Sequence, residues 1–398
     1  MTALLRRSLG PEAILFLAAL VLALWPGLDQ RAARAIAWSP YAAGMASGLI
    51  AWRLRRSRLV FAAAIILAAH ALTTRWASGD AVAFQLAALL LPLNLAAVAL
   101  LPERGVFTSA GLAHWVALAS QAAALYVAVE LEARDLAAPA VVVALGAGGT
   151  ILDTPLGGPA LAAFGMAAAL VAAGHWLASL TTGRGYLWAL GAALMAFHVG
   201  PDATDRAIWV TGAIAMLATG AIELSYVLAY HDGLTGLPGR RALDEALARL
   251  DGRYTVAMVD VDHFKQCNDR HGHDVGDQVL RTVATRLRDA LGDGRVYRYG
   301  GEEFAVLLPQ TPLTDALPQL EAARAAVAGE PFSLRARVRP RKKPTRPRSG
   351  HRPTQETLTV SIGAAESAGS RTAFEQIVRA ADQALYRAKE GGRNQVRS

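Results

Sequence analysis

The sequence predicts an all-α, multi-span membrane domain over residues 1–229, followed by a soluble domain of strands and helices over residues 230–398. Hydrophobic residues make up 53% of the chain and its mean hydropathy is positive, which is unusual for a purely soluble protein. The apolar excess lies before about Tyr230, in stretches close to the roughly 20 residues that a helix needs to cross a bilayer. After Tyr230 the apolar runs become short and are bounded by turn-forming residues.

We expect eight membrane spans in the first domain. They lie near residues 11–27, 38–54, 59–76, 82–101, 108–129, 157–180, 185–200 and 207–229. The apolar stretch 139–152 is short and broken by glycines, so we interpret it as an extracytoplasmic loop or a re-entrant segment. Six spans would also leave both termini on one side of the membrane, whereas seven would not.

The arginines orient the predicted spans. Arg6 and Arg7 precede the first span, and four more arginines lie between the second and third. Short loops rich in arginine stay in the cytoplasm. An even number of crossings then places the soluble domain in the cytoplasm as well.

A few polar side chains fall within the predicted spans: Asn94, Gln121, His70, His114, His175 and His198. Polar groups at membrane depth are costly and often functional, so a sensing or metal-binding role is one interpretation. The other is hydrogen bonding between helices, with histidines beside tryptophans at the interface. We favour the second, because the spacings do not place two metal ligands on one helix.

The net charge of +8 comes from one segment. Residues 335–352 contain seven Arg and two Lys without an acid, interrupted by prolines. The basic composition therefore does not mark the whole chain as a nucleic-acid-binding protein, and we expect no nucleic-acid partner. The segment is either a solvated excursion or a loop that docks on anionic lipid or on an anionic nucleotide. The chain has one cysteine, Cys267, so no internal disulfide forms.

The last span leads into the soluble domain without a flexible tether. Asp232 and Thr235 form turns and caps just ahead of a helix expected over residues 241–250. A movement of the membrane helix would therefore be transmitted to the soluble domain.

A predicted strand and a predicted hairpin carry carboxylates. The strand, residues 254–259, ends in Asp260-Val261-Asp262, where a carboxylate beside exposed carbonyls suits Mg²⁺. The hairpin joins residues 295–299 to residues 304–308 through Gly300-Gly301-Glu302-Glu303. We expect the two glycines to occupy positive φ at the turn, where they leave room for a large ligand.

Further polar residues follow the strand. Phe264 and Lys265 offer backbone amides and an ammonium group to phosphate oxygens. Asn268 and Asp277 are nine residues apart, ahead of a helix expected over residues 278–291, and together can hydrogen-bond a purine edge.

Taken in order, these segments closely resemble the GGDEF domain of diguanylate cyclases. The matching segments are Asp260-Val261-Asp262-His263-Phe264-Lys265, Asn268-Asp269, Gly272-His273, Gly276-Asp277, Arg298-Tyr299-Gly300-Gly301-Glu302-Glu303-Phe304 and Lys389-Glu390-Gly391-Gly392-Arg393-Asn394. Residues 232–238 are similar to the motif that opens the family's domain. The resemblance covers residues 230–398 and does not extend to the membrane half.

The resemblance implies an α+β fold of the palm, or nucleotidyl cyclase-like, type, with a mostly antiparallel sheet flanked by helices. It also implies a transferase that condenses two GTP into cyclic di-GMP and two pyrophosphates. The residues implied to bind Mg²⁺, or Mn²⁺ in its place, are Asp260, Val261 through its carbonyl, Glu302 and Glu303. Glu302 would also activate the attacking 3′-hydroxyl, and Lys265 would offset charge on the phosphates.

The residues that the resemblance implies for GTP binding are Phe264, Asn268, His273, Asp277, Gly300, Gly301, Lys389 and Arg393. Asn268, Asp277 and His273 would place the guanine and ribose. Lys389 and Arg393 would hold the triphosphate from the closing helix, and they share one face if that helix continues through both.

Because each domain would hold one GTP, the resemblance implies a homodimer through two GGDEF domains. It implies a multi-pass protein of the bacterial inner membrane, in contact with lipid, whose cytoplasmic enzyme responds to a signal from the membrane domain. The family's inhibitory Arg-x-x-Asp is replaced by Leu291 and Gly294, so product feedback through that site is absent or relocated.

Two other functions share this sequence pattern. A non-catalytic receptor for GTP or a cyclic dinucleotide would use a degenerate copy of the fold, although the intact acidic and basic residues argue against it. Another nucleotide cyclase with the same palm would differ at Asn268 and Asp277, because these residues select the base.

Overall fold

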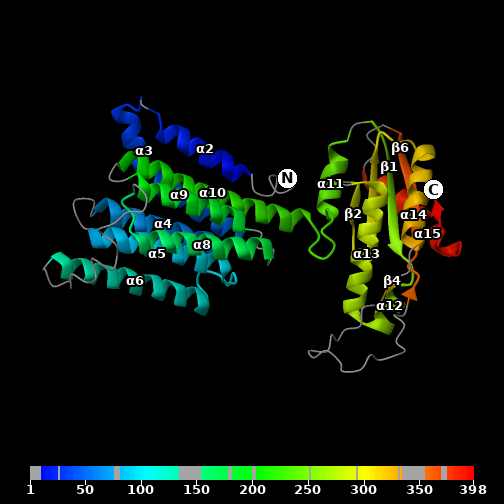
Figure 1. Cartoon of the computed structure of the whole chain (residues 1–398). Helices are drawn as coiled ribbons and strands as arrows, with labels where there is room; N and C mark the ends of the chain where they lie inside the picture. The colour runs from blue at the N-terminus through cyan, green and yellow to red at the C-terminus, as the bar shows by residue number, and fades with distance from the viewer. Residues whose placement is uncertain are drawn as a thin grey trace, which may run out of the picture. The chain divides into compact units, whose positions relative to one another are not determined.

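The computed structural model describes residues 10–25, 27–75, 81–133, 154–177, 182–199, 203–250, 252–292, 295–329, 332–333, 355–368 and 374–398. The chain forms two compact units, Met1–Ser225 and Tyr226–Ser398 (Figure 1). The boundary falls within one long helix, α10 (Ala203–Tyr230).

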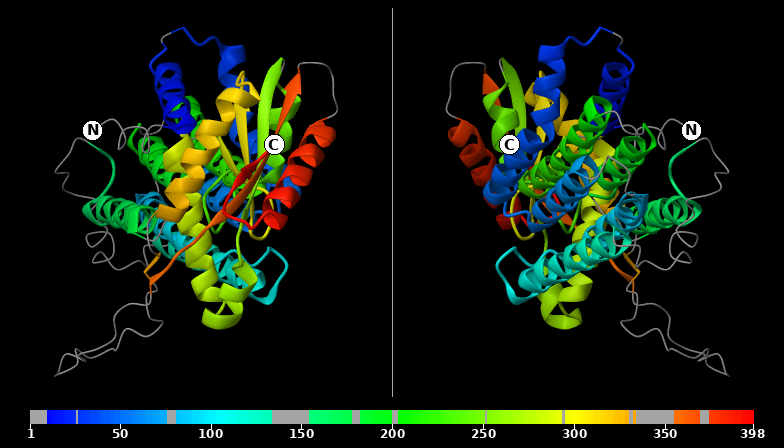
Figure 2. Two further views of the ribbon diagram at one scale, coloured as in Figure 1. Left: turned by 90° about the vertical axis from the view of Figure 1, so that its right-hand side faces the viewer. Right: turned by 90° about the vertical axis from the view of Figure 1, so that its left-hand side faces the viewer.

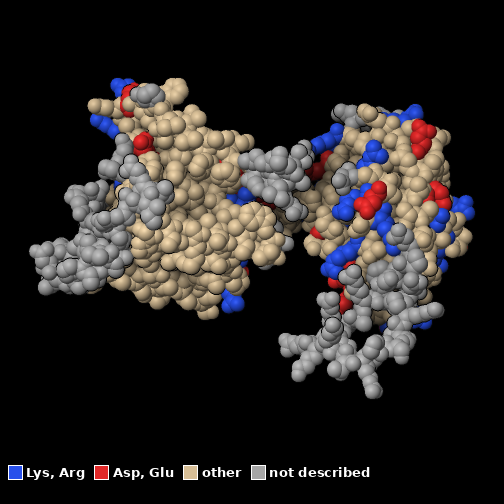
Figure 3. All heavy atoms as spheres, viewed as in Figure 1, with Lys and Arg blue, Asp and Glu red and all other residues tan. Residues whose placement is uncertain are grey.

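The described part of the first unit is helical. Its helices are α2 (Pro11–Ala23), α3 (Gln30–Leu54), α4 (Ser57–Arg75), α5 (Ala81–Leu100), α6 (Ser109–Ala133), α8 (Gly158–Leu177), α9 (Gly183–His198) and the first part of α10. One of these helices lies at each of the eight predicted spans. The face drawn in Figure 3 shows few acidic or basic side chains on this unit, which is typical of a surface that contacts lipid.

Five of the described helices, α4, α5, α6, α8 and α10, are long and apolar enough to cross a membrane. Five of the eight predicted spans thus coincide with a described helix that is long and apolar enough to cross, and the count of eight stays a prediction. With 13 and 16 residues, α2 and α9 extend only about 20–24 Å at 1.5 Å per residue, which is less than a hydrocarbon core of about 30 Å. Helix α3 is 25 residues long, but its first turn and a half contains Arg31 and Arg34. The stretch 139–152, together with Arg6 and Arg7, lies outside the described residues.

Three of the six polar residues within the predicted spans form hydrogen bonds between or along helices. Asn94 on α5 and Gln121 on α6 exchange two hydrogen bonds of 2.7 and 3.3 Å. His114 bonds through Nδ1 to the carbonyl of Ala110, one turn earlier. Across the described residues, no group of three or more His, Cys, Asp or Glu side chains forms a metal site. The interhelical interpretation of Asn94 and Gln121 is confirmed.

The second unit is a sheet covered by helices on both faces. Its elements are α11 (Arg240–Ala248), β1 (Arg253–Val261), α12 (Phe264–His271), α13 (His273–Leu291), β2 (Val296–Arg298), β3 (Glu303–Pro309), α14 (Leu313–Gly329), β4 (Phe332–Ser333), β5 (Gln355–Glu356), β6 (Val360–Ala368), α15 (Phe374–Glu390) and β7 (Val396–Arg397). The main sheet has the order β2-β3-β1-β6-β7, and only the β6–β7 pair is parallel. This confirms the predicted α+β fold with a mostly antiparallel sheet.

The alternation of side chains along β1 divides the core of this unit. Ala257 and Val259 join the core formed with α13 and α14, which lie side by side in Figure 2. Val256 and Met258 face the other way, into the core formed with α11 and α15. Because successive strand residues point to opposite faces, Asp260 continues the set that faces α15.

Helix α15 packs closely on the sheet at Gly363 of β6. A Cβ at this position would lie 1.9 Å from the backbone nitrogen of Leu385, so glycine is required for the approach. An alanine would cost on the order of 1–3 kcal/mol through overpacking. This contact fixes the helix that carries Lys389.

The structure corrects three local expectations. Helix α13 begins at His273, five residues earlier than predicted, because Gly272 at φ +83° allows it to follow α12 directly. Helix α15 ends at Glu390, and Arg393 has φ +64° in the turn that follows. Lys389 and Arg393 therefore do not share a helix face. From the sequence we interpret Tyr386 of the closing helical segment as a core residue, but it is 62% exposed because it lies off the apolar stripe of α15.

Candidate active site

Three carboxylates meet where β1 ends beside the start of β3. The register pairs Asp260 with Glu303, and the amide of Val261 donates to the carbonyl of Glu302 at 3.3 Å. Asp260 is only 5% exposed, whereas Glu302 and Glu303 are half-buried. The antiparallel pairing thus brings together acids that are about 40 residues apart in the sequence.

A basic side chain from α15 reaches the same place. Lys389 Nζ lies 2.9 Å from Asp260 Oδ2. Arg393 is near enough for its positive charge to act on Asp260. The predicted convergence of these two cations with the acids is thus seen, although Arg393 reaches the site from a turn and not from the helix.

The carboxylates shift one another's ionisation. Burial raises the pKa of Asp260, Glu302 and Glu303 above their ordinary values. The charge of Asp260 raises the pKa of Glu302 and Glu303 further, and Lys389 partly offsets this in all three. The site therefore holds an excess of negative charge that a cation would stabilise.

The donor atoms at this edge fit a hard divalent cation. Carboxylate and carbonyl oxygens are the ligands that Mg²⁺ prefers. No three acidic, His or Cys side chains within the described residues form a closed metal cage. Mg²⁺ usually binds through one or two carboxylates, waters and substrate phosphates, so an open edge with Asp260 and either glutamate suits it.

The two glycines of the turn differ from expectation. Neither Gly300 nor Gly301 lies in the left-handed region of positive φ. A Cβ at Gly300 would instead lie 2.8 Å from Glu303 Oε2, so glycine makes room for that carboxylate. A Cβ at Gly301 would meet nothing within 4 Å, which leaves the tip of the turn open.

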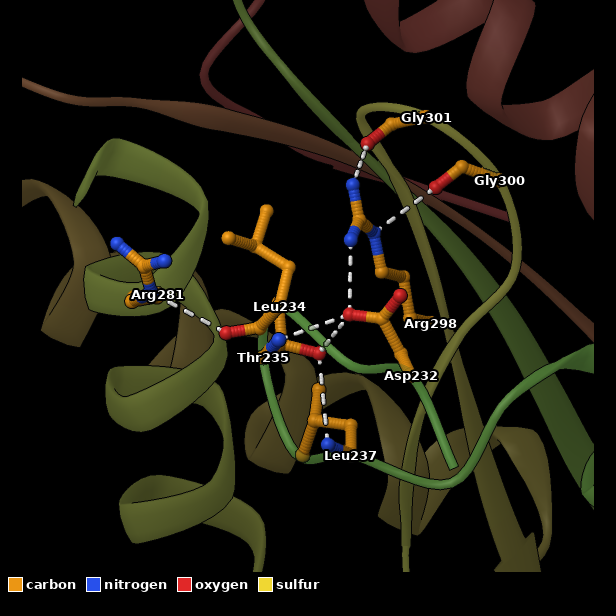
Figure 4. A network of polar contacts seen from close by, with 8 residues as sticks. All are labelled: Asp232, Leu234, Thr235, Leu237, Arg281, Arg298, Gly300 and Gly301. Atoms are coloured by element: carbon orange, nitrogen blue, oxygen red, sulfur yellow. Dashed lines mark hydrogen bonds and ion pairs between the residues drawn. The ribbon is translucent and has the colours of Figure 1, made fainter. Parts of the chain in front are cut away.

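Arg298 holds this turn in place (Figure 4). Its guanidinium donates to the carbonyl of Gly300 at 3.2 Å and to the carbonyl of Gly301 at 2.7 Å. Its third bond, 2.7 Å long, goes to Asp232 Oδ1. Asp232 lies just after α10, so one side chain joins the start of the second unit to the turn that precedes Glu302.

Two further hydrogen bonds hold the carboxylate of Asp232 within its own turn. Its Oδ1 also accepts from the amide of Thr235 at 2.8 Å and from the hydroxyl of Thr235 at 2.7 Å (Figure 4). Burial acts to raise the pKa of Asp232, but the bonds from Arg298 and Thr235 outweigh it and lower the pKa. Sequence reasoning assigned Asp232 to a turn and missed its partner, because the two lie 66 residues apart.

Asp262 is a second residue whose role the sequence did not reveal. Its carboxylate accepts from the hydroxyls of Ser361 (2.7 Å) and Thr359 (2.8 Å) and from the amide of Asn394 (3.1 Å). These bonds fix the turn that contains Arg393 beside the end of β1. The signal in the sequence was the alternation Asp260-Val261-Asp262, which places both acids on one face of a strand.

The residues predicted to contact the base and ribose lie on two adjoining helices. Asn268 lies on α12, and His273 and Asp277 lie in the first two turns of α13. A Cβ at Gly276 would lie 1.9 Å from Asn268 Oδ1, so glycine lets this side chain pack against α13. Asn268 Oδ1 is buried and has no hydrogen-bond partner among the described residues.

The two remaining residues predicted near the phosphates differ in exposure. Lys265 is exposed at the start of α12, whereas Phe264 is buried at 8% exposure and packs near Gly276. Across the described part of the unit, no hydrogen bond or ion pair links Lys265, Asn268, His273 or Asp277 to the carboxylates. The structure thus joins Asp260 and Lys389 directly and leaves the residues predicted to bind the base as a separate group.

Comparison with known proteins identifies relatives of the second unit. Residues 229–395 match the family described as "Diguanylate cyclase, GGDEF domain". Response regulator PleD of Caulobacter vibrioides is 37% identical over 183 residues, covering 44% of this chain and 37% of PleD. Diguanylate cyclase DgcP of Pseudomonas aeruginosa is 40% identical over 173 residues, covering 42% of this chain and 23% of DgcP. The chain thus spans less than half the length of these curated relatives.

A solved structure is similar over the same region. The coiled coil and GGDEF domain of DgcB from Caulobacter crescentus, in complex with c-di-GMP, is 32% identical. The similarity covers 44% of this chain and 88% of that one, with a TM-score of 0.38.

Proposed function

Because residues 229–395 are a GGDEF domain, we propose that this chain is a membrane-bound diguanylate cyclase. The reaction joins two GTP molecules into cyclic di-GMP and releases two pyrophosphates. The observation that carries the proposal is the convergence of Asp260, Glu302, Glu303 and Lys389 at one edge of the sheet. A degenerate receptor has no need to maintain buried, mutually repelling acids, which are costly without a cation.

The charged residues have distinct roles in this proposal. Asp260, Glu302, Glu303 and the carbonyl of Val261 would hold Mg²⁺, or Mn²⁺ in its place, which when bound would neutralise charge on the phosphates. Glu302 accepts the proton of the attacking 3′-hydroxyl, and its raised pKa brings it closer to the working pH of a general base. Phosphoryl transfer depends mainly on positioning and charge neutralisation, which this set supplies.

The basic residues hold the triphosphate. Lys389 already lies against Asp260, so it can bridge the carboxylate and a phosphate oxygen. Arg393 extends from the turn that Asp262 fixes, and exposed Lys265 approaches from α12. The open tip at Gly301 admits the phosphates without a steric obstacle.

The guanine is recognised at α12 and α13. The Asp277 carboxylate accepts hydrogen bonds from N1–H and N2–H of guanine, and the Asn268 amide bonds to the same base. The buried, unpartnered Oδ1 of Asn268 supports this role, because a buried acceptor without a donor is costly until a ligand supplies one. His273, exposed at the start of α13, contacts the ribose.

The remaining parts of the proposal concern assembly and location. Mutual attack requires two GGDEF domains to face each other, so the active form is a homodimer. The five apolar helices support a multi-pass protein of the bacterial inner membrane with a cytoplasmic catalytic domain. A signal in the membrane domain reaches the site through α10 and the Asp232–Arg298 link.

The test is a product assay on the detergent-solubilised full chain. The protein is incubated with GTP or ATP and Mg²⁺, and the products are separated. Cyclic di-GMP from the wild type but not from Glu302→Ala supports the proposal. GTP that binds but is recovered unchanged would instead indicate a receptor, and a monomeric cyclic nucleotide would indicate a different cyclase.

A further inference from the structure

A hollow of about 280 Å³ lies between helices α4, α5 and α6. It is lined mainly by small and apolar side chains, among them Ala68, Leu91, Trp115 and Ala119. An apolar cavity of about 150 Å³ is enough to hold benzene, so this one has room for a larger molecule.

The hollow lies at membrane depth. All three helices are among the five that are long and apolar enough to span a bilayer. The lining comes from the middle of each helix, within residues 64–72, 87–94 and 115–125. An occupant must therefore dissolve in the hydrocarbon core of the bilayer before it can enter.

One wall of the hollow carries a polar pair. Asn94 and Gln121 both line it and exchange two hydrogen bonds of 2.7 and 3.3 Å. Each amide has two N–H donors and two acceptor lone pairs, so one donor and at least one lone pair remain on each. They have no other hydrogen-bond partner among the described residues. Spare polar capacity in hydrocarbon is costly, and a ligand with a matching group would satisfy it.

Close packing between helices does not explain why small residues line the hollow. Alanines at a helix interface normally let two helices approach closely, yet Ala68 and Ala119 remain exposed on its wall. Helix α6 packs loosely on its neighbours, since only 11% of its apolar segment Ser109–Val127 is buried. A helix of a second copy, about 10–12 Å across, is too wide for a space of this size.

We propose that this hollow binds a membrane-soluble small molecule, apolar over most of its length, whose carbonyl or hydroxyl group hydrogen-bonds to Asn94 and Gln121. The apolar part packs against the alanines, Leu91 and the ring of Trp115. The site does not depend on the catalytic activity of the second unit, so binding can be measured without it.

The test uses the full chain in lipid nanodiscs and two photoreactive diazirine probes of equal length. One probe is a ten-carbon alcohol and the other is the matching alkane. After irradiation, labelled peptides are identified by mass spectrometry. We expect the alcohol to label α4, α5 and α6 about 2- to 10-fold more than the alkane, the ratio that one net hydrogen bond gives. A matching methyl ketone shows whether a carbonyl alone is enough.

Three variants complete the test. The double variant Asn94→Leu with Gln121→Leu should remove the preference for the alcohol while alkane labelling persists. Ala119→Phe should reduce labelling by both probes. Ala117→Phe, two residues away, exposed and outside the lining, should leave labelling unchanged.

Two results would overturn the proposal. Equal labelling by alcohol and alkane in the wild type would show that the amides recognise nothing. If Ala119→Phe left labelling unchanged but altered the mass of the oligomer, a second copy of the chain would cover this face.

Discussion

The two ends of the candidate active site are built differently. At the sheet end, Asp260, Glu303 and Lys389 are held by strand register and by the close packing of α15 on Gly363. At the helix end, His273 is exposed and Asn268 keeps a buried acceptor without a partner. Asp260 and Lys389 form an ion pair before any ligand arrives, whereas the buried acceptor of Asn268 has no partner among the described residues.

This difference follows from the free energy of leaving each kind of group alone. An unpaired buried charge is much more costly than an unpaired amide, so Asp260, the most buried of the three acids, is compensated by Lys389 within the protein. A buried neutral amide without a partner is less unfavourable in free energy than an unpaired charge. Once a ligand binds, the amide discriminates against a base that cannot form its hydrogen bonds. In the proposed function, the sheet end therefore serves chemistry and the helix end serves base selection.

The largest expected effect is at Glu302. In Glu302→Gln we expect kcat to fall by about 100- to 10,000-fold, the contribution typical of a general base. The fold should be retained, because the variant removes one of several repelling charges. Initial rates of cyclic di-GMP formation measure the effect, with Glu375→Gln on the exposed side of α15 as the control. An active Glu302→Gln enzyme would contradict the assignment of catalysis to the sheet end.

The next effect concerns base selection. Asp277→Asn should reduce kcat/KM for GTP by about 10- to 100-fold, because hydrogen bonds to a charged acceptor contribute about 1.5–3 kcal/mol. The loss should be smaller for ITP, which lacks the N2 amine. The ratio of kcat/KM for the two nucleotides is the measurement, and Asp269→Asn, exposed on α12, is the control. If kcat falls equally for both nucleotides, Asp277 belongs to the catalytic end.

A third change tests the link between α10 and the glycine turn. Arg298→Ala removes three hydrogen bonds, so we expect local opening of the turn to become easier by about 1.5–3 kcal/mol. Amide hydrogen exchange at Tyr299 and Gly300, whose N–H groups bond to the carbonyl of Glu303, should speed up about 10- to 150-fold. Unchanged exchange would mean that the strands alone hold the turn.

The pH dependence of this link has a definite sign. The pKa of Asp232 is lowered in the folded protein, so the stability from its bonds is present above its ordinary value of 3.8. That stability is lost as the pH falls through the lowered value. The difference between Arg298→Ala and the wild type should therefore shrink only in strong acid.

The smallest effect is the response of stability to Mg²⁺. The pKa values of Asp260, Glu302 and Glu303 are raised, so their contribution to stability is present below the ordinary values of 3.8–4.5 and is lost as the pH rises through the raised values. Mg²⁺ should restore on the order of 1 kcal/mol at about ten times its Kd. Thermal unfolding with and without Mg²⁺ should differ more at pH 8 than at pH 5. An equal shift at both pH values would place the ion elsewhere.

The order of the motifs was sufficient to predict the α+β fold, and the acids and cations of the sheet end do converge. Both expectations came from the resemblance to the GGDEF domain, whereas strand alternation by itself predicts only that Asp260 lies at the end of a strand, on the same face as Val256 and Met258. Apolar length likewise indicated membrane helices, although only five described helices are long and apolar enough.

Other features depend on contacts between distant segments. Arg298 meets Asp232 across 66 residues, and Asp262 meets the amide of Asn394 across 132. The space at Gly300 is taken by Glu303, and the approach of α15 requires Gly363, whereas the sequence suggested only turn conformation for the glycines. Local sequence determines which groups are available, through backbone preference and hydrophobic pattern. Only the packed structure decides which of them are neighbours, because that depends on how whole strands and helices pack together.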